Sequence, residues 1–195
     1  MKVFINPGHC PKYDSGAVGY GLNECDVVLK IGKQVENILK VAGITTKLFQ
    51  CDSLQQICTE ANFWGADLFV SIHANASESH SANGTESFAY YDSVEGLKLA
   101  NAINSKIVKN FPTLKDRGAK EINFFVLRNT AMTAALVETA FIDNYSDNQL
   151  LKSHADDFAK AIAQGILFYA GLKPDIVDFN ADKILCPHCG TEFSL

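Results

Sequence analysis

Short apolar segments alternate with longer amphipathic ones along most of this chain. The apolar segments read as strands and cover residues 2–5, 44–48, 67–73, 86–91, 124–127 and 135–139. The longer segments read as helices and cover residues 22–41, 54–64, 94–111 and 149–169, the last with a break in it. Strands that alternate with helices predict an α/β fold, here with a mainly parallel, twisted sheet flanked by helices.

Four polar side chains lie where these predicted elements meet loops. His9 follows the first strand after a Pro-Gly break, His73 ends the third strand, and Glu24 lies near the start of the first helix. Glu138 lies at the end of an otherwise apolar strand, where a charge is costly without a task or a partner. Sites in parallel sheets gather at the carboxyl ends of strands, so we expect His9, His73 and Glu138 to lie together.

Two imidazoles and one carboxylate are a typical ligand set for an open zinc site. We therefore expect His9, Glu24 and His73 to bind Zn²⁺ and to leave a fourth position for water. Zinc lowers the pKa of such a water and polarises a carbonyl oxygen. Because Glu24 cancels part of the metal charge, a separate base is expected to help. Glu138 can take the proton of the water and pass it to a departing amine.

These segments resemble the zinc-dependent N-acetylmuramoyl-L-alanine amidases of the amidase_3 type. The matching blocks are residues 6–9 (NPGH) with 14–19 (DSGAVG) and Glu24, residues 71–76 (SIHANA), and residues 125–130 (FVLRNT) leading into 136–144 (LVETAFIDN). The likeness covers about residues 1–171. It implies a peptidoglycan hydrolase that cleaves the amide between N-acetylmuramic acid and L-alanine. Cys10, Thr133 and Ala140 differ from the residues common in that family. The three expected metal ligands and Glu138 are all present.

Structural roles compete with the metal interpretation of the three ligands. His9 could cap a turn and His73 could be a satisfied histidine at the end of a strand. Glu24 could serve only the dipole of the helix that it begins. The shared placement of the three with Glu138 favours the metal site.

Several other residues near these blocks have both a functional and a structural interpretation. Glu138 could be half of a buried ion pair with Arg128 or Arg117. Arg128 could bind a carboxylate of the stem peptide through its planar fork, or form a structural salt bridge. Asn75 could orient the substrate, or close the loop after the third strand. Cys10 could reach the metal, although a small buried side chain is the plainer role.

Length, composition and charge limit the class of protein to which this chain can belong. The chain has 195 residues, a hydrophobic fraction of 47% and a formal net charge of −5. These values fit one catalytic domain and argue against nucleic acid as the main partner. No apolar run is long enough to insert into a membrane. The N-terminus carries no secretion signal, so we expect a protein made in the cytoplasm that acts at the bacterial cell wall, as an endolysin or an autolysin does.

The C-terminus predicts a separate small element. We expect a catalytic domain at residues 1–171, a linker at 172–185 and a zinc-ribbon-like remnant at 186–195. Cys186 and Cys189 form one Cys-x-x-Cys knuckle, which supplies only half of a structural zinc site. The tail could be metal-free, or two copies could share one zinc and form a homodimer.

Two other functions compete with the amidase. One is a zinc peptidase that cuts within the stem peptide. The other is a non-catalytic peptidoglycan-binding module that has kept the fold. Glu138 distinguishes them, because a pure binder has no use for a carboxylate beside an open metal position.

Overall fold

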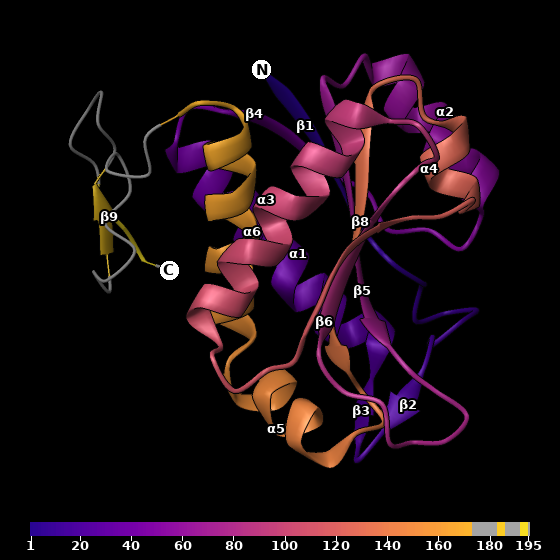
Figure 1. Cartoon of the computed structure of the whole chain (residues 1–195). Helices are drawn as coiled ribbons and strands as arrows, with labels where there is room; N and C mark the ends of the chain where they lie inside the picture. Colours follow the sequence, from indigo (N-terminus) through magenta and orange to yellow (C-terminus); the bar gives the residue numbers. More distant parts are fainter. Residues whose placement is uncertain (173–182, 186–191, 195) are drawn as a thin grey trace.

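A six-stranded sheet forms the centre of the molecule in this computed structural model, which describes residues 1–172, 183–185 and 192–194 (Figure 1). In spatial order the strands are β4 (Thr45–Leu48), β1 (Lys2–Pro7), β5 (Leu68–Asn75), β8 (Thr133–Phe141), β6 (Thr85–Ala89) and β7 (Asp116–Glu121). Neighbouring strands are parallel except for β6 and β8, which are antiparallel. The predicted α/β fold with a mainly parallel sheet is confirmed.

Helices cover both faces of the sheet, and each face has its own apolar core. One face packs against α1 (Glu24–Val41), α3 (Val94–Asn110) and α6 (Ala155–Tyr169) through residues such as Val70 and Val137. The other face packs against α2 (Leu54–Trp64) and α4 (Phe125–Asn129) through residues such as Phe69 and Leu136. Because successive strand residues point to opposite faces, a strand apolar throughout fills both cores.

The first helix follows its sequence pattern closely. Its apolar residues at helical spacing are buried, from Val27 and Val28 to Ile38 and Leu39. The helix ends at Val41, and Gly43, two residues later, has a φ of 78°, the left-handed conformation that glycine adopts easily after a helix. The helix begins at Glu24 and not at residue 22, because residues 22 and 23 form β3 (Leu22–Asn23), which pairs with β2 (Val18–Gly19). This short hairpin leads the chain back towards the sheet with Glu24 at the first helical position.

Three predictions about the elements were wrong or incomplete. Residues 124–127 are not a strand, because Phe125–Asn129 is the short helix α4, which packs on α2. The strand β7 (Asp116–Glu121) was not predicted, since its sequence DRGAKE is polar. The predicted break in the closing helical region is confirmed at His154, between α5 (Tyr145–Ser153) and α6, but the region begins earlier than the predicted residue 149.

The C-terminal tail is described only in part. The strand β9 (Lys183–Leu185), in the predicted linker, pairs antiparallel with β10 (Glu192–Ser194). Cys186 and Cys189 lie outside the described residues, so the zinc knuckle and the tail-mediated homodimer stay predictions.

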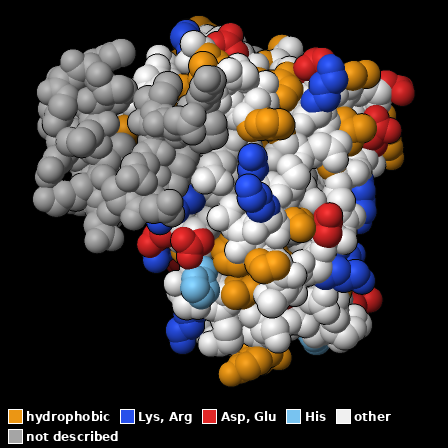
Figure 2. All heavy atoms as spheres, turned by 60° about the vertical axis from the view of Figure 1, so that its left-hand side comes forward, with side chains coloured by type: hydrophobic (Ala, Val, Ile, Leu, Met, Phe, Trp, Pro, Cys, Tyr) orange, Lys and Arg blue, Asp and Glu red, His pale blue; other side chains and the backbone are white. Residues whose placement is uncertain are grey.

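Surface charge is mixed on the face that Figure 2 shows, where acidic and basic side chains are interspersed and neither sign forms a broad patch. Among the described residues, none of the helices combines the length and the hydrophobicity that a membrane span requires.

Candidate metal centre

Three segments far apart in the sequence bring the predicted ligands together. His9 comes from the loop after β1, Glu24 begins α1, and His73 lies near the carboxyl end of β5. The Glu24 carboxylate bridges the two rings, with Oε2 3.2 Å from His9 Nε2 and Oε1 3.0 Å from His73 Nδ1. Ligand atoms of all three residues lie within 4.8 Å of one another. Cys10 is not part of this cluster, and its backbone forms two hydrogen bonds with the backbone of Asp14.

Asp14 and the local backbone orient the His9 ring. His9 has a φ of 56°, an uncommon conformation for a residue with a side chain and one that often marks functional sites. Its Nδ1 lies 2.7 Å from Asp14 Oδ2, while Asp14 Oδ1 accepts a hydrogen bond from the Gly16 N–H. A carboxylate on one ring nitrogen directs the other nitrogen, Nε2, towards a metal. These contacts also fix the start of the loop between His9 and Glu24.

Glu24 is buried and held on both oxygens. Oε2 accepts a hydrogen bond from the Ala17 N–H at 2.9 Å, and Oε1 accepts one from the Ala74 N–H at 3.1 Å. Burial, the largest single influence, would raise the pKa of this carboxyl, but the contacts with His73 and His9 outweigh it and lower the pKa. The same hydrogen bond to Glu24 raises the pKa of His9 to about 9. The cluster is therefore built around a carboxylate that stays ionised, as a metal ligand must.

Two glycines leave the room that the cluster needs. A Cβ on Gly8 would lie 2.2 Å from His73 Cε1. A Cβ on Gly16 would lie 2.6 Å from Glu24 Oε2 and 2.7 Å from His9 Cδ2. Both glycines lie within the sequence blocks named above, but the sequence does not reveal their role, because only the folded chain shows what a side chain there would meet.

Glu138 lies beside the cluster without a partner. It is opposite His73 in the pairing of β8 with β5, three residues before the end of β8. Its Oε2 is buried and has no hydrogen-bond partner among the described residues. Burial raises the pKa of Glu138 to about 7. Neither arginine forms the ion pair considered above, since Arg117 contacts Glu86 and Arg128 contacts Asn123.

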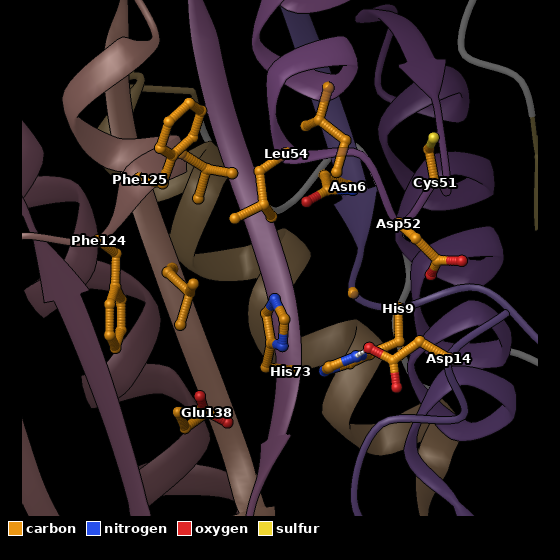
Figure 3. A pocket seen from close by; sticks show the side chains of 14 residues that line it. Asn6, His9, Asp14, Cys51, Asp52, Leu54, His73, Phe124, Phe125 and Glu138 are labelled. Carbon is orange, nitrogen blue, oxygen red and sulfur yellow. Dashed lines mark hydrogen bonds and ion pairs between the residues drawn. The ribbon is translucent and has the colours of Figure 1, made fainter.

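A pocket of about 410 Å³ opens over these groups, with His9, His73 and Glu138 in its wall (Figure 3). Apolar side chains from α2, from α4 and the residue before it, and from β8 form much of the remaining wall, and they include Leu54, Ile57, Phe124, Phe125, Val126 and Leu136. Asn75 and Arg128 are not among the lining residues. The Asn75 side-chain amide donates to Glu86 at 2.8 Å. The substrate-binding roles of Asn75 and Arg128 stay predictions.

The donor set and its surroundings fit a zinc ion. Two imidazole nitrogens and a carboxylate oxygen converge, which are ligands that zinc takes in open sites. Asp14 places a carboxylate on the far nitrogen of the His9 ring, as is usual behind a metal ligand. Gly8 and Gly16 leave space for the ligand side chains. The arrangement can therefore hold a metal next to an unpaired carboxylate in a pocket with an apolar wall.

Comparison with known proteins points to one family. Residues 3–167 match the Amidase_3 family, described as N-acetylmuramoyl-L-alanine amidase. The N-acetylmuramoyl-L-alanine amidase LytC of Bacillus subtilis is 41% identical over 86% of this chain and 35% of the relative. The endolysin of Bacillus phage SPP1 is 39% identical over 88% of this chain and 66% of the relative. The chain thus spans less than two thirds of either.

A solved structure shares the fold over nearly its whole length. The N-acetylmuramoyl-L-alanine amidase AmiC2 of Nostoc punctiforme superposes with a TM-score of 0.82 and 39% identity. The match covers 88% of this chain and 97% of that chain.

Proposed function

The chain belongs to the Amidase_3 family of N-acetylmuramoyl-L-alanine amidases, and on this premise we propose that it hydrolyses the amide between N-acetylmuramic acid and L-alanine in peptidoglycan. The single observation that carries the proposal is the Glu138 carboxylate beside the His9, Glu24 and His73 cluster, with its Oε2 unpartnered in the part of the chain that the structure describes. A carboxylate in that position is costly for stability and useful for proton transfer. The names of two relatives, an endolysin and a probable cell wall amidase, support action at the bacterial wall.

Zinc is the proposed cofactor, held by His9, Glu24 and His73. Zinc in an open site lowers the pKa of a bound water and polarises a carbonyl oxygen. Glu24 stays ionised, and Asp14 keeps the His9 ring in the orientation that points Nε2 towards the other ligands.

Glu138 carries the proton in both halves of the proposed reaction. Its Oε2 accepts the proton of the attacking water, since none of the described residues forms a hydrogen bond with that oxygen. The nitrogen of an amide leaves poorly until it is protonated, so Glu138 then donates the proton to the departing L-alanine nitrogen. A pKa raised to about 7 by burial suits both steps, because neither proton transfer is then strongly uphill. The apolar pocket wall limits the water around the carboxylate.

Product analysis tests the bond that is cut. Purified peptidoglycan is digested with the protein loaded with zinc, and the products are identified by mass spectrometry and by labelling of new amino termini. We expect a free lactyl group on muramic acid and a new amino terminus on L-alanine. A new terminus at a later stem residue would identify a peptidase instead. Binding to the wall without any released product would identify a wall-binding module.

Zinc binding should release a proton from His9. Because the hydrogen bond to Glu24 raises the pKa of His9 to about 9, the imidazole of the metal-free protein is protonated at pH 7.5. A metal takes only the neutral ring, so binding expels that proton and the apparent affinity rises with pH up to about 9. Calorimetry in two buffers of different ionisation enthalpy measures the released proton. A binding enthalpy that is the same in both buffers would contradict the assignment of His9.

A further inference from the structure

A row of polar side chains crosses the sheet from the metal centre to its edge. In the pairing of the strands, His73 of β5 lies opposite Glu138 of β8, and Glu138 lies opposite Glu86 of β6. The edge strand β7 then supplies Arg117 and Lys120, both of which form ion pairs with Glu86. The row therefore leads from the proposed reacting groups to two cations.

Glu86 holds both cations but can neutralise the charge of one of them only. Its side chain is buried, and Oε1 accepts hydrogen bonds from Arg117 Nε at 3.0 Å and from Asn75 Nδ2 at 2.8 Å. Lys120 Nζ donates to Oε2. Taken by themselves, the three side chains of Glu86, Arg117 and Lys120 carry a net charge of +1.

Within the described ranges, Arg117 and Lys120 each form a side-chain hydrogen bond to Glu86 alone, so both keep donors for a ligand. Arg117 binds Glu86 through Nε, and among the described residues its two terminal nitrogens have no hydrogen-bond partner. The guanidinium is held over the Phe141 ring at 5.0 Å, while 27% of the Arg117 side chain is exposed. Lys120 Nζ lies 6.0 Å from the centre of the Phe88 ring, and Phe88 packs against the pocket residue Phe124. A fixed guanidinium fork beside a lysine is a binding site for a carboxylate.

The distance from Glu138 suits a short extended peptide. Neighbouring strands are about 4.8 Å apart, so β7 lies roughly 10 Å from β8, and its two cations reach back to Glu86 on the strand between them. Two extended residues span at most about 7 Å. A peptide whose first residue has its departing amine beside Glu138 can therefore place a carboxylate of its second residue beside Arg117 and Lys120.

We propose that Arg117 and Lys120 form a subsite for the free carboxylate on the stem-peptide residue that follows L-alanine, with Glu86 as the residue that positions them. This proposal rests on the proposed amidase function. It adds a preference among substrates: a stem peptide with a carboxylate at its second residue is favoured over the same peptide with that group amidated.

The test compares two muropeptides that differ only in this group, one with the free carboxylate and one with the amide. The wild-type protein should cleave the carboxylate form with a kcat/KM about tenfold or more higher, as expected for hydrogen bonds to a charged group. Arg117→Gln and Lys120→Gln should bring that ratio close to one. Lys47→Gln is the matched control, because Lys47 is also on an edge strand, paired with Glu60 and 6.0 Å from the ring of Phe4.

The ratio separates recognition from a damaged fold, which would lower both rates alike. If Arg117→Gln fails to fold, since it weakens the hold on buried Glu86, the more exposed Lys120 still provides the test. A wild-type ratio near one, or a ratio kept in Lys120→Gln, would overturn the subsite. Calorimetric affinities of the same two muropeptides need no turnover. If neither is cleaved but the carboxylate form binds more tightly and Lys120→Gln removes that preference, the amidase proposal fails and the subsite stands.

Discussion

Glu138→Gln is expected to stop turnover while zinc stays bound. The amide has nearly the shape of the carboxylate and replaces a group that is not among the proposed ligands, but it cannot accept the proton of the attacking water. Loss of a general base typically costs about a hundred- to ten-thousand-fold in rate. Release of soluble peptidoglycan fragments gives the rate, and metal analysis gives the zinc content.

The control for this change is Glu95→Gln on α3, an exposed glutamate that pairs with Lys98 away from the pocket. It should keep both rate and zinc. Near-normal turnover by Glu138→Gln would remove Glu138 from the mechanism. Loss of zinc together with activity would instead make it part of the metal site.

The pH profile offers a second measure of the same residue. Burial raises the pKa of Glu138 to about 7, and the protonated form cannot act as a base, so the rate should fall as the pH is lowered through the pKa. A bound cation nearby favours the carboxylate, so this fall in the zinc-loaded protein is expected below pH 7. The residual rate of Glu138→Gln should lack it. An identical acid limb in both proteins would assign the limb to another group.

The elements that sequence reasoning located correctly are those with a strong local pattern. The helix that begins at Glu24 buries one regular stripe, and β1, β5 and β8 are apolar on both faces because the sheet is covered on both sides. The strand predicted at residues 124–127 is a helix in the structure, because a short apolar run is compatible with a buried helix as well as with a strand. The strand β7 has no apolar pattern, and its pairing with β6 at the sheet edge overrides its weak propensity.

The residues of the candidate site also fall into those that the sequence predicts and those that it does not. His9, Glu24, His73 and Glu138 could be predicted because each stands at a boundary between an apolar segment and a loop. Glu86 could not, since its place opposite Glu138 follows from the antiparallel pairing of β6 with β8, across 52 residues of sequence. Register of this kind depends on the whole sheet and leaves no local signal. The roles of Gly8 and Gly16 were hidden for a related reason, because they depend on side chains that reach them only in the folded chain.

Gly16→Ala is expected to remove zinc and activity almost as completely as loss of a ligand. The new Cβ would lie 2.6 Å from Glu24 Oε2 and 2.7 Å from His9 Cδ2, too close for either side chain to keep its place. Changes in the groups around metal ligands typically cost about ten- to a hundredfold in affinity or activity. Displacing two ligands at once should reach at least the upper end of that range. Zinc content and rate should fall together, as they should in Glu24→Ala.

Gly21→Ala is the control that isolates this clash. Gly16 and Gly21 have left-handed φ values of 68° and 82°, so alanine at either position carries a similar backbone penalty, on the order of 1–2 kcal/mol. A Cβ on Gly21 would meet nothing within 4 Å. Gly21→Ala should therefore lose some thermal stability but bind zinc and cleave peptidoglycan normally. If both variants kept their zinc, the cluster would be more tolerant than its geometry implies. If both lost it, backbone strain in this stretch, and not the contact of residue 16 with Glu24 and His9, would control the site.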